Sequence, residues 1–273
     1  MSKIGLIQVD GTLPNLALMK LATWHKAQGD EVTIIDISSH RFDKIYGSKI
    51  FMGGTGYDLS AKLPPEIEEV IPDYAAFGLD YSIGFFSRGC GRNCGFCIVQ
   101  EKEGPFHDVD TKWITKQKVI LLDNNFLVSP LWKAKLEKFI KNKNKVCFNQ
   151  GLDIRLVTPE KAEVLSRVKY YDLGFRKRRL YFAFDNPVIE PQIHRGVFTL
   201  DEAGIPPAHL MFYILVGFNT AFEQDVHRFN VINSKGCLPY IMLYNRTRDK
   251  NLMRFARWVN KRYYKVVKFE DYK

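Results

Sequence analysis

The sequence contains no long hydrophobic run and no recognisable secretion signal. Among its 273 residues, no stretch of about eighteen consecutive apolar residues occurs, which argues against a transmembrane helix. The first residues, MSKIGLIQVDG, lack the basic region, apolar core and small-residue cleavage site of a signal peptide. We therefore expect a cytoplasmic protein with no membrane partner.

Cysteine is also scarce, and its distribution argues against a disulfide scaffold. Three of the five cysteines lie at positions 90, 94 and 97, and only Cys147 and Cys237 lie elsewhere. Such clustering favours metal binding. The chain is 46% hydrophobic and 26% charged, so we expect a folded protein with a sizeable core. Its formal net charge of +10 favours an anionic partner, such as nucleic acid or a phosphorylated metabolite.

The first part of the chain has the pattern of a small α/β domain. Residues 3–9 and 31–37 are short apolar runs rich in β-branched residues, and residues 16–27 carry apolar side chains at helical spacing. A helix that connects two such strands favours a parallel pair. The proline-rich segment LPPEIEEVIPDY then predicts a short helix and an extended link. We place this open, Rossmann-like domain at residues 1–75.

The remaining chain alternates apolar runs with amphipathic stretches. Helices are predicted at 132–141, 159–168 and 220–233, and this alternation is typical of βα units that form a partial or complete parallel barrel. We place this barrel at residues 76–245, followed by a basic C-terminal helix and tail at 246–273. The six predicted strands are 81–86, 119–122, 146–148, 180–184, 210–216 and 240–244.

The three clustered cysteines follow the first strand of the barrel region in the spacing C-x3-C-x2-C. Cys90, Cys94 and Cys97 cannot fill a tetrahedral zinc site alone, but they can hold three irons of a cubane and leave the fourth iron free to bind a ligand. Glycines at 89, 91 and 95 let the loop fold around a cluster. The alternative is a structural zinc site completed by a distant residue, namely His107, Cys147 or Cys237.

The segment CGRNCGFC resembles the C-x3-C-x-φ-C signature of radical S-adenosylmethionine (SAM) enzymes, with Phe96 in the aromatic position. The segments GFFSRGCGRNCGFC, VILLDNNF, YFAFDNP and YILVGFNTAFEQD are similar to the first, second, fourth and fifth strand regions of the branch that carries an N-terminal cobalamin-binding-type domain. The resemblance covers residues 72–245. It implies a partial parallel (β/α)6 barrel of radical SAM type behind a small open α/β domain.

The same resemblance implies the chemistry. A 4Fe-4S cluster on the three cysteines would bind SAM and cleave it reductively to methionine and a 5'-deoxyadenosyl radical, which takes hydrogen from a substrate. A reducing partner such as flavodoxin or ferredoxin would supply the electron.

Polar residues after the second and fourth strands are candidates for SAM binding. Asp123, Asn124 and Asn125 follow the second strand, at the position that meets the SAM amino group in the family. Asp185 ends the fourth strand, where the family often has a polar SAM contact. In both places the alternative is a turn or helix cap.

A second group of candidates follows the third strand in CFNQGLDIRL. Gln150, Asp153 and Arg155 offer a carboxylate for ribose hydroxyls and a guanidinium for the SAM carboxylate. The alternative is a surface ion pair or the start of the next helix.

Two other features receive a structural interpretation. The run 53–56 (GGTG) lacks a following Lys-Ser/Thr and the G-x-G-x-x-G frame, so we expect a turn rather than a phosphate loop. Cys147 lies within a predicted strand and is expected to be buried. Cys237 precedes Leu238, near the last strand, and its role stays open.

The tail combines basic and aromatic residues, which is a pattern of nucleic-acid contact. A second interpretation is an amphipathic helix packed on the barrel, because some tail residues form an apolar helical stripe. The basic residues are Arg246, Arg248, Lys250, Arg254, Arg257, Lys261, Arg262, Lys265 and Lys268; the aromatic ones are Phe255, Trp258, Tyr263 and Tyr264; the stripe is Leu252, Phe255, Ala256 and Val259.

The chain departs from its relatives in two ways. Residues 1–80 contain no D-x-H-x-x-G loop, since His25 and His40 have other neighbours, so we do not expect cobalamin unless it binds without a histidine ligand. The three further N-terminal cysteines of tRNA methylthiotransferases are also missing. The alternatives that remain are a cobalamin-dependent radical SAM methyltransferase and a zinc-stabilised, non-catalytic nucleic-acid-binding protein. The sequence does not indicate the substrate, the reaction type, a catalytic side chain or the oligomeric state.

Overall fold

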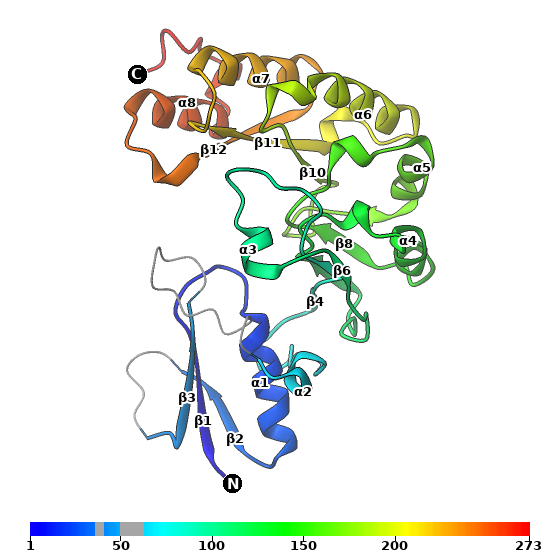
Figure 1. Cartoon of the computed structure of the whole chain (residues 1–273), viewed down its shortest axis with the longest axis vertical. Coiled ribbons are helices and arrows are strands. Elements are labelled where there is room, and N and C mark those ends of the chain that lie inside the picture. The colour runs from blue at the N-terminus through cyan, green and yellow to red at the C-terminus, as the bar shows by residue number, and fades with distance from the viewer. Residues whose placement is uncertain (36–40, 50–62) are drawn as a thin grey trace. The chain divides into compact units, whose positions relative to one another are not determined.

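The computed structural model describes residues 1–35, 41–49 and 63–273 (Figure 1). The predicted turn at 53–56 and His40 lie outside the described residues. The chain divides into two compact units, which are residues 1–85 with 110–120 and residues 86–109 with 121–273. It has a mixed α/β fold with parallel sheets, as predicted. The predicted domain boundaries at residues 75 and 245 stay predictions.

The first unit begins with a three-stranded parallel sheet. The strand order is β2-β1-β3, and Ile4 of β1 pairs with Val32 of β2 and with Lys44 of β3. The predicted strand, helix and strand are confirmed. β3 was not predicted, because its sequence, KIYGS, has no continuous apolar run and only Ser48 in it is buried. The elements are β1 (Lys3–Gln8), α1 (Leu16–Ala27), β2 (Glu31–Ile34), β3 (Lys44–Ser48), α2 (Pro65–Glu68) and β4 (Tyr81–Gly84).

The core of the first unit lies between α1 and the sheet. Asn15 caps α1, because its side chain accepts a hydrogen bond of 3.1 Å from the backbone N–H of Leu18. Apolar side chains from β1, α1 and α2 form one buried cluster. His25 is buried at the end of α1, where its ring nitrogens lie 2.8 Å from Asp30 Oδ2 and 3.0 Å from the Tyr46 hydroxyl. This histidine therefore has a structural role.

The second unit holds most of the predicted barrel region; β7 spans the division between the units. Its strands are β5 (Ser87–Arg88), β6 (His107–Asp108), β7 (Lys118–Leu121), β8 (Lys145–Phe148), β9 (Lys169–Tyr170), β10 (Leu180–Ala183), β11 (Leu210–Val216) and β12 (Leu238–Leu243). Its helices are α3 (Val99–Glu103), α4 (Trp132–Lys141), α5 (Pro159–Arg167), α6 (Glu190–Glu202), α7 (Phe222–Ser234) and α8 (Lys250–Asn260). Short 3-10 helices lie at Phe126–Val128, Ile154–Leu156, Pro187–Ile189, Pro207–His209, Tyr244–Arg246 and Tyr263–Lys265.

The strands β8 to β12 pair in parallel within two sheets. The order β10-β11-β12 forms one sheet, in which Leu180 pairs with Leu210 and Tyr213 with Tyr240. β8 pairs in parallel with β9, and a parallel bridge between Leu152 and Phe182 links the segment after β8 to β10. The six predicted strands are all present, with ends that shift by at most two residues. A barrel of radical SAM type stays a prediction.

Helices cover one face of the β10–β12 sheet (Figure 1). Leu210, Phe212, Ile214 and Val216 alternate along β11 and are fully buried. The three helices predicted from the sequence correspond to α4, α5 and α7. The helix α6 was not predicted, because Pro191 and Gly196 weaken its helical pattern.

The C-terminal segment contains the predicted amphipathic helix. α8 packs against β12, and Phe255 and Val259 on its apolar stripe are fully buried. Trp258 is only 8% exposed, so neither it nor Phe255 is free to stack on a nucleic-acid base. Within the described ranges, no helix has the length and apolarity needed to cross a membrane.

Candidate site around the cysteine loop

Cys90, Cys94 and Cys97 lie on one loop of the second unit, between β5 and α3. All three are free thiols; Cys90 and Cys94 are partly buried and Cys97 is exposed. The loop turns tightly, because the Cys97 N–H donates to the Cys94 carbonyl at 2.9 Å. No group of three or more His, Cys, Asp or Glu side chains is arranged to hold a metal ion in the part of the chain that the structure describes.

Gly89 allows the chain to enter this loop. Its φ of +71° is in the left-handed region, and a Cβ atom at this position would lie 2.5 Å from the Pro105 carbonyl oxygen. No other residue type fits this close approach of two backbone segments. The conformation of Gly89 therefore places Cys90 relative to the segment that follows α3.

The helix α3 holds the loop by side-chain hydrogen bonds. The Gly89 N–H donates to Glu103 Oε2 at 3.0 Å, and Gln100 Nε2 donates to the carbonyls of Cys90 and Arg92 at 2.9 and 3.2 Å. Because these contacts come from residues just after the cysteines, the sequence 87–103 forms one locally bonded segment.

Asp123 fixes the backbone that leads into the cysteine loop. Its carboxylate accepts hydrogen bonds from the Phe86 N–H at 2.9 Å and from the N–H and hydroxyl of Ser87, both at 2.6 Å. Burial raises the pKa of Asp123 to about 6, although these donors favour the charged form. Both oxygens thus already have partners within the protein, and Asp123 positions the loop.

Lys135 binds the carbonyl of Phe86, the residue whose N–H is bound by Asp123. Lys135 was not singled out in the sequence. Its Nζ donates to the Phe86 carbonyl at 2.6 Å and also contacts Asp108, and the residue is 7% exposed. The available signal was a lysine within the apolar stripe of α4, beside Leu136 and Phe139. A basic residue in such a stripe indicates a buried partner.

The two asparagines after Asp123 differ in their contacts. Asn124 Nδ2 donates to Glu103 Oε2 at 2.8 Å. Asn125 is 3% exposed, and its Nδ2 lies 3.7 Å from Cys90 Sγ and 3.5 Å from Asp153 Oδ2. Its side chain does not cap the following 3-10 helix. Its Oδ1 is buried and has no hydrogen-bond partner among the described residues.

Asp153 connects the cysteine loop to Arg155. Its carboxylate accepts from Arg155 Nε at 2.7 Å and Nη2 at 2.9 Å, and from Arg92 Nε at 3.0 Å. Burial opposes ionisation of Asp153, but the hydrogen bonds and charge of Arg155 outweigh burial and lower its pKa. The side chain of Asp153 is 7% exposed and that of Arg155 is 30% exposed. Asp153 also caps the 3-10 helix Ile154–Leu156, because its Oδ1 accepts from the Arg155 N–H at 3.1 Å, as the alternative of a helix start predicted.

Arg155 also brings a positive charge to the thiols. Burial raises the pKa of the Cys94 thiol, and the charge of Arg155 opposes this shift. The same guanidinium acts on Asp185, whose pKa is raised by burial and whose Oδ1 accepts from the Leu215 N–H at 2.9 Å. Cys94, Arg155 and Asp185 therefore lie within electrostatic range of one another, and their binding of SAM stays a prediction.

The aromatic and amide candidates lie in different environments. Phe96 packs edge-on against Phe218 with ring centroids 5.5 Å apart, and Phe218 packs against Tyr244 at 4.8 Å. These three rings form an aromatic wall beside the loop. The side chain of Gln150 is exposed. Phe218 and Tyr244 were not singled out in the sequence, because only the folded sheet brings them to Phe96.

The buried ion pair of Arg228 and Asp225 was also not singled out in the sequence. The charge of Arg228 acts on Asp185. Arg228 is fully buried and donates to the carbonyls of Phe184 at 2.6 Å and Leu215 at 2.8 Å, and to Asp225 Oδ1 at 2.5 Å. It thereby ties α7 to the carboxyl ends of β10 and β11. An i, i+3 pair of opposite charges inside the apolar pattern of α7 was the available signal.

The two remaining cysteines are buried thiols. Cys147 is fully buried, which confirms the prediction, and Cys237 is 3% exposed. Burial raises the pKa of each thiol to about 12, so both stay protonated at neutral pH. His107 is exposed, and its Nδ1 lies 3.1 Å from the Pro105 carbonyl.

No protein-family model matches this chain, and no curated protein matches its sequence. The function must therefore be argued from the cysteine loop and the side chains that surround it.

Proposed function

We propose that this chain is a radical SAM enzyme whose 4Fe-4S cluster is held by Cys90, Cys94 and Cys97. The observation that carries the proposal is the combination of three free thiols on one loop with a buried amide oxygen, that of Asn125, which lacks a partner among the described residues. The guanidinium of Arg155 acts electrostatically on two of these thiols, those of Cys90 and Cys94.

The residue types present match the two groups that the proposal requires, although the described side chains are not arranged to hold a metal ion. Three thiolates are the ligands of three irons in a cubane with one open iron. A buried acceptor without a donor is rare in proteins, and the ammonium group of SAM is a donor that would satisfy Asn125 Oδ1. Arg155 uses its Nε and Nη2 to bind Asp153, which leaves its Nη1 as a donor for a carboxylate such as that of SAM.

The residues of this chain would bind, orient and shield the reactants. When bound, the cluster supplies one electron for the cleavage of SAM to methionine and a 5'-deoxyadenosyl radical, which removes a hydrogen atom from the substrate. Asn125 and Arg155 would orient the amino and carboxylate groups of SAM. Phe96 and Phe218 would exclude water from the region of the radical.

Other residues position this machinery without touching the reactants. Asp123 and Lys135 hold Phe86, the residue from which the loop begins. Asp153 holds Arg155 and, through Arg92, the loop itself. The substrate is expected to be anionic, because the chain carries a net charge of +10, and nucleic acid is one substrate class with this property.

Metal content tests the proposal. The full chain would be purified and reconstituted without oxygen, and its iron, sulfide, zinc and cobalt measured for the wild type and for Cys→Ser variants at 90, 94 and 97. Cys237→Ser is the matched control, because this cysteine is buried away from the loop. We expect about four irons and four sulfides in the wild type and control, and their loss in the three loop variants. Zinc alone would overturn the proposal in favour of a zinc-stabilised binding protein.

Cobalt content separates the remaining alternative. A chain that holds cobalt together with the cluster would be a cobalamin-dependent methyltransferase. We expect no cobalt, because residues 1–80 contain no D-x-H-x-x-G loop. In the part of the first unit that the structure describes, the ring nitrogens of His25 lie against Asp30 and the Tyr46 hydroxyl.

A further inference from the structure

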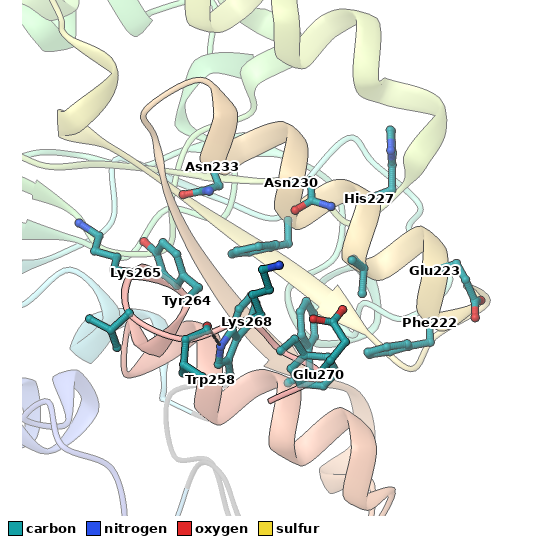
Figure 2. A pocket seen from close by; sticks show the side chains of 16 residues that line it. Phe222, Glu223, His227, Asn230, Asn233, Trp258, Tyr264, Lys265, Lys268 and Glu270 are labelled. Atoms are coloured by element: carbon teal, nitrogen blue, oxygen red, sulfur yellow. Dashed lines mark hydrogen bonds between the residues drawn. The ribbon is translucent and has the colours of Figure 1, made fainter. Parts of the chain in front are cut away.

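The second unit contains an open cavity that is separate from the residues of the cysteine-loop site. It has a volume of about 810 Å³ and lies between α7, α8 and the C-terminal segment 264–270 (Figure 2). A volume of this size is typical of sites for small molecules and cofactors. Its lining combines aromatic, amide, basic and acidic side chains, so it is not a simple apolar gap between helices.

One wall of the cavity is a polar face of α7. Glu223, His227, Asn230 and Asn233 follow one another at spacings of four, three and three residues, which places them along one side of the helix. His227 is already engaged, because its Nε2 lies 2.8 Å from Glu190 Oε2. The amides of Asn230 and Asn233 remain available to a ligand.

The opposite wall comes from the C-terminal segment. It contributes Lys265 and Lys268, and Figure 2 shows the side chain of Lys268 extending toward α7. Both lysines are exposed. The structure gives Lys265, Lys268, Asn230 and Asn233 no side-chain hydrogen bond or ion pair within the described residues. These four polar side chains are thus available to bind a ligand.

Aromatic rings form the floor of the cavity. Tyr264 packs against Phe229 at 5.3 Å and against Trp258 at 5.9 Å between ring centroids. Phe229 and Trp258 are buried by these contacts, while Tyr264 is partly exposed and lines the cavity. A planar ligand can therefore stack on the accessible part of Tyr264.

We propose that this cavity binds a nucleoside 5'-phosphate. The base would stack on the Tyr264 side of the aromatic floor, since a stacked base is a sequence-tolerant ligand of aromatic rings. The side-chain amides of Asn230 and Asn233 match the donor and acceptor pairs on the edge of a base such as adenine. Lys265 and Lys268 bind the phosphate by charge-assisted hydrogen bonds.

The charges of the cavity give the ligand a direction. Glu223 lies at the end opposite Lys265, and Glu270 lies toward the side of Phe222 (Figure 2). These carboxylates repel a phosphate from their end of the cavity. The phosphate therefore lies toward Lys265. The nucleotide is either a free molecule or one unit of a single-stranded nucleic acid. Both offer the cavity the same base and phosphate groups.

Titration of the full chain with adenosine 5'-monophosphate (AMP) tests this site, and it does not depend on a cluster in the cysteine loop. We expect saturable binding of one AMP by calorimetry, with adenosine and inorganic phosphate each binding more weakly. Lys268→Glu and Asn233→Leu should each weaken AMP binding about tenfold or more, because each removes a charge-assisted or polar contact. The matched control is Lys141→Glu, which makes the same charge change at an exposed position of α4 and should alter the affinity less than twofold.

Two results would overturn the inference. One is the absence of saturable AMP binding at millimolar concentration; the other is AMP binding that Lys268→Glu leaves unchanged while the variant keeps its fold by circular dichroism. An adenylate hexanucleotide distinguishes the sources. If the hexanucleotide binds at least tenfold more tightly than AMP, and Lys268→Glu abolishes this binding, the ligand is a unit of a nucleic-acid strand. If the hexanucleotide and AMP bind with equal affinity, the ligand is a free nucleotide.

Discussion

Arg92 donates a hydrogen bond of 3.0 Å from its Nε to Oδ2 of Asp153, across 61 positions of the sequence. Arg92 lies between the first two cysteines of the loop, whereas Asp153 lies in the segment after β8. The position of the thiols therefore depends on a carboxylate outside the loop. Asp153 also holds Arg155, so one side chain sets both the loop and the nearby positive charge.

Removing the charge of Asp153 should loosen the cysteine loop. In Asp153→Asn the side chain keeps a single acceptor oxygen, so at least one of Arg92 and Arg155 loses its partner. We expect the variant to lose about 1–3 kcal/mol of unfolding free energy and to retain less iron after desalting. The matched control is Asp110→Asn, which breaks an exposed pair with Lys112 and should leave the iron content unchanged. An Asp153 variant that keeps its full iron content contradicts the positioning role.

The raised pKa of Asp123 predicts a pH dependence of stability. Its folded pKa of about 6 lies above its ordinary value of 3.8, so protonated Asp123 is favoured in the folded state. The stability associated with this group is fully present below about pH 4 and is lost as pH rises toward 6. One pKa unit corresponds to about 1.4 kcal/mol, so the loss is roughly 3 kcal/mol at most.

Urea unfolding of the wild type and Asp123→Asn between pH 4 and pH 7 measures this effect. The wild type should lose stability relative to the variant as the pH rises through this window, because only the wild type carries the buried carboxylate. If the wild type instead gains relative stability, the donors from Phe86 and Ser87 outweigh burial and the pKa is lowered.

Gly89 and Gly91 form a matched pair for testing the shape of the loop. An alanine at 89 would place its Cβ 2.5 Å from the Pro105 carbonyl at a φ of +71°, whereas a Cβ at 91 has no neighbour within 4 Å. Gly89→Ala should therefore cost about 1–3 kcal/mol and reduce iron binding. Gly91→Ala should match the wild type in thermal unfolding and iron content. Equal behaviour of the two variants would show that the loop does not require a glycine at 89.

The ion pair of Arg228 and Asp225 should be essential for the stability of the second unit. Arg228→Met leaves the buried Asp225 carboxylate with only the Thr220 hydroxyl as a donor and removes a donor from the carbonyls of Phe184 and Leu215. We therefore expect a loss of about 3–5 kcal/mol. Arg195→Met is the control, because Arg195 is exposed on α6. Thermal unfolding followed by circular dichroism measures both. A small effect at 228, comparable to that at 195, would contradict the account of this buried pair.

The features that the sequence predicts correctly are local. The alternation of buried residues along 210–216 and the spacing of apolar residues in 132–141 each lie within one element, and the structure has both elements at those bounds. The cysteine motif is also contained in eight residues, but the cluster that it predicts stays a prediction. Local patterns suffice here because burial on one side of a strand or helix imposes its own period.

The features that were missed depend on contacts between distant residues. The helix α6 contains Gly196, which reads as a helix breaker, yet a Cβ there would lie 2.5 Å from Ile154 Cγ1. The glycine is thus required by packing. In the same way, the roles of Asp123, Asp153 and Arg228 follow from partners that only the folded chain brings near, so the sequence indicated polar residues without indicating what they bind.

Reductive cleavage of SAM is the most direct test of the proposed function. The reconstituted full chain would be incubated without oxygen with SAM and dithionite, and 5'-deoxyadenosine measured by chromatography for the wild type and Cys94→Ala. The proposal predicts 5'-deoxyadenosine and methionine from the wild type and none above background from the variant. A wild type that holds about four irons, as a cubane requires, and leaves SAM intact would contradict it.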